Sequence, residues 1–317
     1  MCSPCESLEQ VVANILAIVK GDKANPCRDD DGAEYFFRGE CCNWATRNNA
    51  DIGSAFDCSL DRDKYRYENE RALYQEALRH NVVSFAEDKT MAERIARMQH
   101  YWLPTRFADL SINALQATLF AAGGCQPDGR GVRDLDGFIR VIKVAKHKMK
   151  SFTSDIIVAI SHLPLVDADN IHPENGSKRD LGYLAYEMQS ERPTFELDSC
   201  GKRGISLYDE IQQVWAFKPL MNNPRIRNQG GLFLAFGCRD GKEPLHPTFS
   251  ERDYTNPNAP SYGIAQVGFV RIAAAAKKTI LDQLRMFGMT EEAVYPDLQN
   301  VCQTLDKRFK ENYENGH

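Results

Sequence analysis

The stretch from residue 98 to residue 110 brings polar side chains of several chemical types close together in the sequence. An imidazole, a guanidinium and a carboxylate come from His100, Arg106 and Asp109, and hydroxyl groups come from Tyr101 and Thr105. An arginine held by an aspartate beside a histidine would form a recess that favours an anionic ligand. The stretch therefore indicates a binding or catalytic site.

Each of these residues also has a structural interpretation. Asp109 would orient Arg106 or accept hydrogen bonds from the first backbone amides of the helix expected at 111–122, and Thr105 would cap a helix that begins near Asp109. A histidine at a helix end, such as His100, is often a cap or a core residue whose nitrogens are hydrogen-bonded. The sequence leaves both interpretations open.

Arg38 is a second residue that needs a polar partner. It follows the aromatic run at 35–37 and precedes Gly39, a pattern typical of a short strand. Because an unpaired guanidinium is costly to bury, we expect either an internal carboxylate or an anionic ligand beside it. Glu70, on a helix that follows, is the internal candidate. The phosphate or ribose oxygens of a ligand would suit the planar fork of arginine.

Gln229 precedes two glycines, Gly230 and Gly231, at the start of an expected strand. Glycine at such a place allows the backbone to approach a ligand closely or to bend sharply. Gln229 would then either contact the ligand or tie down its loop through backbone hydrogen bonds. The glycine pair alone lacks the spacing of a phosphate-binding loop or a dinucleotide-binding motif.

The polar residues of 98–110 are expected to lie on a turn between two helices. Met91, Ile95 and Met98 recur at helical spacing, and Pro104 ends this helix because the residue before a proline is disfavoured in the helical region. The largely apolar run at 112–122 is typical of a buried helix. Two packed helices would thus present the polar groups from a loop.

The rest of the chain shows helices early and strands later, which indicates an α+β fold. Further helices are expected at 6–19, 65–78, 181–189 and 277–287. Gly21 would end the first of these and Gly288 the last, and Thr290 would cap the next helix. β-branched or aromatic runs predict strands at 35–38, 138–144, 156–160, 211–217, 232–236 and 267–272.

No linker divides the chain, so we expect a single domain over residues 1–317. Within it, residues 163–206 are expected to be an insertion, because apolar runs shorten there and polar residues accumulate. A 43% share of apolar residues provides a sufficient core, and a net charge of −5 gives no general attraction to nucleic acid.

The composition also bears on location and metals. No apolar stretch approaches the roughly 20 residues of a membrane span, so we expect a cytoplasmic protein without membrane contact. The ten cysteines are then expected to be reduced, packed thiols. Cys2 with Cys5 and Cys41 with Cys42 lack the spacing of a zinc site, and no metal is expected.

These motifs together resemble the FRG-domain family, which is named for a Phe-Arg-Gly tripeptide. A second family motif reads Gln-His-(Tyr/His)-Gly-Leu-Pro-Thr-Arg, continues with Leu-Leu-Asp-Trp-Thr and precedes an aliphatic helix that ends in Phe-Ala. The tripeptide stands at 37–39, the second motif at 99–106, and the helix ends at 120–121. Blocks at 223–233 and 277–298 are similar to the family's later patterns.

Three positions depart from the family pattern. Trp102 replaces a glycine, Ala108 replaces a leucine, and Leu110 with Ser111 replaces a tryptophan and a threonine. We therefore expect the geometry of this turn to differ from that of other members.

The order of an early strand with an arginine, a middle turn with a hydroxyl and a late strand preceded by an amide is similar to the ADP-ribosyltransferase fold. The resemblance implies N-terminal helices packed on a mainly antiparallel, ADP-ribosyltransferase-like split sheet. It also implies an enzyme that takes NAD as its substrate and cleaves the nicotinamide glycosidic bond through an oxocarbenium-like state. Family members suggest bacterial or phage defence or toxin systems, with a nucleic acid or a protein as acceptor.

The resemblance assigns roles to the residues above. Arg38 would hold the phosphate or ribose, Gln229 would bond the ribose, and Tyr101 or Trp102 would stack on the nicotinamide. The expected catalytic residues are Arg38, His100 and Gln229, and the expected substrate-binding residues are Tyr101, Trp102, Thr105, Arg106 and Asp109. Most such transferases have a glutamate where Gln229 stands, which favours transfer to a nucleic acid base or a weak hydrolase.

The alternative is a non-catalytic module that binds a nucleotide or nucleic acid through the same recess. In that case residues 163–206 would contact a partner. A nuclease is disfavoured because it would need clustered carboxylates for metal ions beside the motifs.

Overall fold

In the part of the chain that the structure describes, a mixed sheet of seven strands forms the centre. The structure is a computed structural model that describes residues 3–23, 32–42, 57–61, 64–123, 135–166, 181–195, 202–220, 227–228, 231–238 and 244–294. The strand order is β4-β5-β6-β2-β1-β3-β7, with β4 and β5 parallel and every other pair antiparallel. The strands are β1 (Glu34–Glu40), β2 (Phe107–Ser111), β3 (Gly137–Val144), β4 (Met149–Ser151), β5 (Val214–Lys218), β6 (Gly231–Phe236) and β7 (Ile264–Ile272). The expected α+β class is confirmed.

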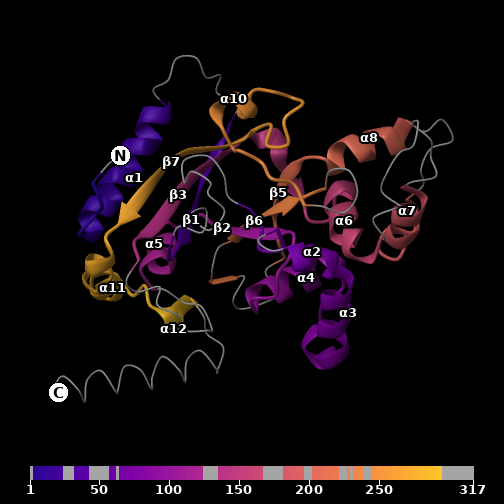
Figure 1. Cartoon of the computed structure of the whole chain (residues 1–317), viewed down its shortest axis with the longest axis horizontal. Coiled ribbons are helices and arrows are strands. Elements are labelled where there is room, and N and C mark those ends of the chain that lie inside the picture. The colour runs from indigo at the N-terminus through magenta and orange to yellow at the C-terminus, as the bar shows by residue number, and fades with distance from the viewer. Residues whose placement is uncertain are drawn as a thin grey trace.

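Helices pack on the sheet in two groups, seen at its two ends in Figure 1. The first group packs with β3 and β7 and consists of α1 (Leu8–Lys23), α5 (Ala114–Gly123) and α11 (Lys277–Met286). The second packs with β5 and β6 and consists of α3 (Glu70–His80), α4 (Met91–His100), α6 (Asp155–His162), α7 (Gly182–Met188) and α8 (Lys202–Ile211).

A separate core lies on the opposite face of the sheet. Side chains alternate along a strand, so Phe107 belongs to the helical side while Ala108 belongs to this second core. Loop residues complete it, among them Leu60 and Leu245, which are fully buried. The sheet is therefore covered by helices on one face and mainly by loops on the other.

The run at 156–160 is a helix, not the expected strand. It forms the centre of α6, and every residue from Ile156 to His162 is buried. A short apolar run predicts burial, but it does not distinguish a central strand from a helix enclosed by other helices. Packing against α4, α7 and α8 decides the matter here.

The turn at 98–110 also differs from the expectation. It joins α4 to a strand, β2, and the following helix, α5, begins only at Ala114. The motif residues Phe107 and Asp109 therefore lie inside the sheet, between β1 and β6. The sequence missed this strand because it is short and its apolar residues run into those of α5.

The helix boundaries predicted at Gly288 and Thr290 are confirmed, whereas two other helices differ from the prediction. Gly288 has φ +74° just after α11, and the Thr290 hydroxyl accepts from the Ala293 amide at 3.3 Å in α12 (Glu291–Val294). However, α1 continues through Gly21 to Lys23. The expected helix at 65–78 is interrupted at Asn69, between α2 (Lys64–Glu68) and α3.

The described parts of 163–206 are integrated into the fold. Leu184 and Met188 on α7 are fully buried in the same core as α6. A short helix, α10 (Glu251–Tyr254), precedes β7. No helix of the described residues has the length and apolar character needed to cross a membrane.

Candidate functional site

Arg38 on β1 is paired inside the protein. Its Nε donates to Oε1 of Glu40 at 3.2 Å, and its Nη1 donates to Asp109, to Oδ1 at 3.1 Å and to the backbone carbonyl at 2.8 Å. Burial by itself would lower the pKa of Arg38, but Asp109 and Glu40 raise it. The expectation that Glu70 is the internal partner of Arg38 is wrong, because Glu70 binds Arg106 instead.

Each residue of the tripeptide at 37–39 has a structural role that explains its residue type. Among the described residues, β1 and β2 pair at one position, Phe37 opposite Ser111. Beyond it Arg38 bridges the two strands by donating to the backbone of Asp109. Gly39 allows α5 to lie against β1, because a Cβ there would be 1.9 Å from the carbonyl oxygen of Ala117.

Glu40 connects Arg38 to a second arginine. Its Oε2 accepts from Nε of Arg140 on β3 at 2.9 Å, and Nη1 of Arg140 donates to Oε1 of Gln266 on β7 at 2.6 Å. The formal charges of the two arginines cancel those of the two carboxylates, Glu40 and Asp109. We call Arg38, Glu40, Asp109, Arg140, Gln266 and Gln99 the strand network.

Asp109 connects the strand network to the end of α4. Its Oδ1 also accepts from Nε2 of Gln99 at 2.7 Å. Burial by itself would raise the pKa of Asp109, but Arg38 and His100 outweigh it and the pKa is lowered. The side chain is still 33% exposed. Asp109 is therefore an ionised carboxylate that is held in place and yet reaches the surface.

The partners expected for Asp109 were Arg106 or the first amides of the next helix, and this expectation is wrong. Asp109 lies in the middle of β2, opposite Phe233 on β6, and so is not at a helix start. Its partners are Arg38 and Gln99. The strand order, which places β1 beside β2, decides this pairing.

His100 is the last residue of α4 and is buried. Its Nδ1 lies 2.6 Å from the carbonyl oxygen of Ala96, and its ring meets Phe233 edge-on with 5.6 Å between centroids. A carbonyl oxygen only accepts, so Nδ1 carries a proton. His100 thus combines a core position with an electrostatic effect on Asp109.

Arg106 and Thr105 make other contacts. Both oxygens of Glu70 accept from Arg106, at 2.7 Å and 2.8 Å, and the carbonyl of Gly237 accepts from it at 3.2 Å. Arg106 is 1% exposed. The hydroxyl of Thr105 accepts from the amide of Phe107 at 3.2 Å, so it does not cap a helix. Arg106 therefore fastens the start of β2 to α3.

Tyr101 and Trp102 are large aromatic side chains at the surface, 54% and 48% exposed. Trp102 has φ +70°, in the left-handed region that favours glycine. This conformation explains the glycine that is usual at this position in the family pattern. The chain therefore presents a tryptophan ring from a backbone shape that a tryptophan adopts only at a cost.

Gln229 lies outside the described residues. Its neighbour Asn228 donates from Nδ2 to the carbonyl of Ala293 at 2.7 Å, and Gly231 lies opposite Ser111 on β2. The structure thus brings Arg38, Asp109 and the end of α4 together and leaves the expected role of Gln229 a prediction.

Four residues of the strand network were not selected from the sequence. Gln99 and Glu40 stand next to His100 and Gly39, so their places in the motifs were a usable signal. Arg140 and Gln266 lie in apolar strand runs and had no local signal. Only the pairing of β3 with β1 and β7 brings them to Glu40.

Comparisons with known proteins support one family. The FRG domain, as a family model, matches residues 33–128. This range includes the tripeptide at 37–39 and the motif at 99–106, so the resemblance is confirmed there. The match ends before the blocks at 223–233 and 277–298, whose likeness stays a prediction. No curated protein and no solved structure matches the chain.

Proposed function

We propose that this FRG-domain chain binds NAD beside Asp109 and cleaves its nicotinamide glycosidic bond, as an ADP-ribosyltransferase-like enzyme. In this reaction the bond from ribose C1′ to the nicotinamide nitrogen breaks, and nicotinamide leaves with the electron pair. A water molecule or a nucleophile of a nucleic acid or protein acceptor then bonds to C1′ and releases its proton. The transition state resembles an oxocarbenium ion.

The observation that carries the proposal is the position of Asp109. Its carboxylate is held by Arg38 and Gln99 and is one third exposed beside the end of α4. A fixed carboxylate accepts hydrogen bonds from ribose hydroxyls and stabilises positive charge that develops on the sugar. Because the pKa of Asp109 is lowered, it carries this charge at neutral pH.

Two exposed aromatic rings just after α4 suit the binding of a nucleotide. Tyr101 and Trp102 directly follow α4, whose residue Gln99 holds Asp109. Aromatic rings at a surface stack on flat heterocycles such as nicotinamide or adenine. We infer that one of these rings stacks on the ligand while Asp109 contacts the ribose.

The charge balance changes the role proposed for Arg38. Its guanidinium already binds two carboxylates, and the strand network is formally neutral. We therefore assign Arg38 the positioning of Asp109, not the binding of a phosphate. His100 then acts by lowering the pKa of Asp109.

The test is titration calorimetry of the full chain with NAD, together with an assay for released nicotinamide. Asp109→Asn should reduce nicotinamide release by at least about tenfold, since removing one stabilising group of a developing charge has effects of this size or larger. Tyr186→Ala, on α7 and 68% exposed, is the control for loss of a surface ring. Thermal melts should show both variants folded.

A second function is a non-catalytic module that binds a nucleotide or nucleic acid. The observation that favours it is that Glu40 and Asp109 both accept from arginines, which makes them weak bases. In this case NAD or AMP binds, the loss of Asp109 weakens binding, and no nicotinamide appears. Absence of both binding and release would contradict either function.

A further inference from the structure

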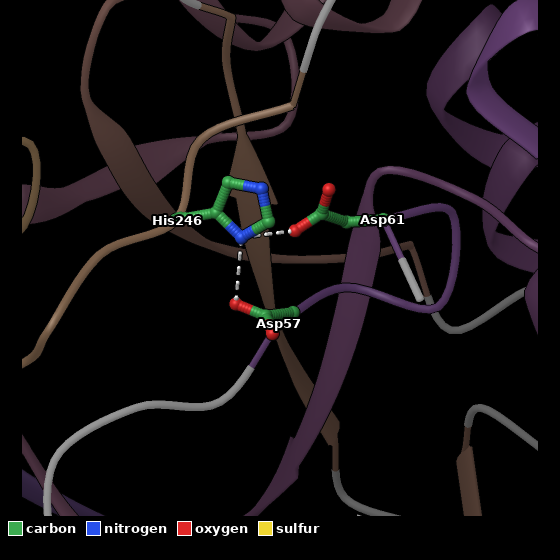
Figure 2. Close-up of side chains that lie close together, drawn as sticks. All are labelled: Asp57, Asp61 and His246. Atoms are coloured by element: carbon green, nitrogen blue, oxygen red, sulfur yellow. Dashed lines mark ion pairs between the residues drawn. The ribbon is translucent and has the colours of Figure 1, made fainter. Parts of the chain in front are cut away.

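A second group of ligand-type side chains lies on the loop-covered face of the sheet, as Figure 2 shows. Nδ1 of His246 is 2.6 Å from Oδ2 of Asp61 and 3.4 Å from Oδ1 of Asp57. The three ligand atoms all lie within 4.8 Å of one another. In Figure 2 both carboxylates point toward the same nitrogen of the imidazole.

Buried neighbours hold the two segments that carry these side chains. Cys58 and Leu60, which lie between the two aspartates in the sequence, are fully buried in the second core. Leu245, also fully buried, anchors the backbone beside His246. The arrangement is therefore fixed by packing on both sides and does not depend on the ion pairs alone.

One side of this group is open to solvent. The side chain of Asp61 is 1% exposed and that of Asp57 is 23% exposed, whereas that of His246 is 56% exposed. A bound ion would thus keep at least one position for water. Sites with three protein ligands and an open position are common for zinc.

The donor set limits the ions that fit. One imidazole nitrogen with two carboxylate oxygens suits Zn²⁺ and other first-row divalent ions better than Ca²⁺ or Mg²⁺, which take oxygen ligands only. Tetrahedral ligands at zinc distances lie about 3.3 Å apart. The separation between His246 and Asp57 fits, and that between His246 and Asp61 would have to open by about 0.7 Å.

We propose that Asp57, Asp61 and His246 bind a divalent transition-metal ion, with Zn²⁺ as the preferred ion. Two carboxylate oxygens lie 2.6 Å and 3.4 Å from one imidazole nitrogen, and this arrangement of one nitrogen and two anionic oxygens favours a cation at this point. The ion would replace the imidazole proton on Nδ1 and join residues 57–61 to the segment that contains Leu245. This proposal is independent of NAD binding.

The bound ion would also stabilise the start of β2. The amide of Leu60 donates to the carbonyl of Thr105 at 3.2 Å, and the amide of Thr105 donates to the hydroxyl of Ser59 at 3.0 Å. These bonds tie the segment that holds both aspartates to the residue before Arg106. Metal binding should therefore raise the melting temperature of the whole chain.

The experiment is titration of the metal-free full chain with Zn²⁺ by calorimetry and with Co²⁺ by visible absorption. We expect one ion per chain in the micromolar range or tighter and a higher melting temperature. The Co²⁺ spectrum should lack the near-ultraviolet band of thiolate ligands, which matters because the chain has ten cysteines. His246→Gln and Asp57→Asn should each weaken binding at least tenfold.

His80→Gln is the matched control. His80 is 65% exposed and lies 3.4 Å from a single carboxylate, that of Glu76, so it should bind no ion and its loss should leave the titration unchanged. The proposal is overturned if the wild type binds no ion, if His246→Gln binds as the wild type does, or if the thiolate band appears. Each of these outcomes would leave the group as an ion pair only.

Discussion

Arg38 and Trp102 occupy motif positions with different requirements. The position of Arg38 requires side-chain hydrogen bonds, whereas that of Trp102 requires a particular backbone angle. Arg38 gives one donor to a backbone carbonyl and two to carboxylates at the place where β1 and β2 part. A lysine has no planar fork with which to reach these three acceptors together. Trp102 instead occupies a left-handed position where a glycine would be unstrained.

This difference predicts opposite effects of glycine at two adjacent positions. Trp102→Gly should raise the free energy of unfolding by about 1 kcal/mol, because a side chain in the left-handed region costs roughly that much. Tyr101→Gly, at φ −97°, should lower it, since glycine there only adds freedom to the unfolded chain. Urea unfolding of both variants measures the difference. A lower stability for Trp102→Gly would mean that packing of the ring outweighs the strain.

At the level of elements, the site depends on close contact between β1 and α5. Gly39 and Gly137, on the adjacent strands β1 and β3, both face backbone carbonyls of α5, those of Ala117 and Ala121. The helix can therefore lie directly on the sheet. This contact fixes the part of β1 from which Arg38 reaches β2.

Gly39→Ala should destabilise the fold by about 1–3 kcal/mol or more, because the added methyl group would overlap backbone that cannot move independently. Gly21→Ala is the control, since nothing lies within 4 Å of a Cβ there and the residue is inside α1. That change should be neutral or stabilise by about 0.5–1 kcal/mol. Equal effects in chemical unfolding would refute the close contact.

At the level of the whole molecule, a buried charge makes stability depend on pH. Lys148 is fully buried, and its Nζ lies 3.9 Å from the centre of the Trp215 ring and 3.4 Å from the carbonyl oxygen of Val214. Burial, with a smaller effect of Lys150, lowers the pKa of Lys148 from 10.5 to about 7. The unfolded chain therefore holds this proton to higher pH than the folded chain does.

The sign of the pH effect follows from this difference. Between about pH 7 and about pH 10 the unfolded state binds more protons at Lys148, so this group makes stability rise by about 1 kcal/mol per pH unit. Lys148→Met should remove that slope, and its gain in stability over the wild type should be largest at and below about pH 7 and shrink as pH rises toward 10. Lys146→Met, at an exposed position, is the control. Parallel pH profiles of wild type and Lys148→Met in urea unfolding would exclude the effect.

Local patterns in the amino-acid sequence are sufficient to predict several elements and the motifs on them. The periodicity over α4, the aromatic run of β1 and the glycine after α11 follow from local sterics and from the spacing of apolar residues. The motif at 99–106 likewise identified the segment that leads into β2, the strand that carries Asp109. These features involve residues near one another in the chain, so they can be predicted without knowledge of the fold.

Contacts between groups far apart in the chain depend on how the strands and helices pack in three dimensions. The pairing of Arg38 with Asp109, and of Arg106 with Glu70, depends on the strand order and on where α3 packs. The helix around Ile156 and the approach of His246 to two aspartates depend in the same way on packing between segments far apart in the chain. Such pairings form because the folded molecule buries apolar groups and pairs buried charges. A local sequence pattern does not show which distant segments will provide the partners.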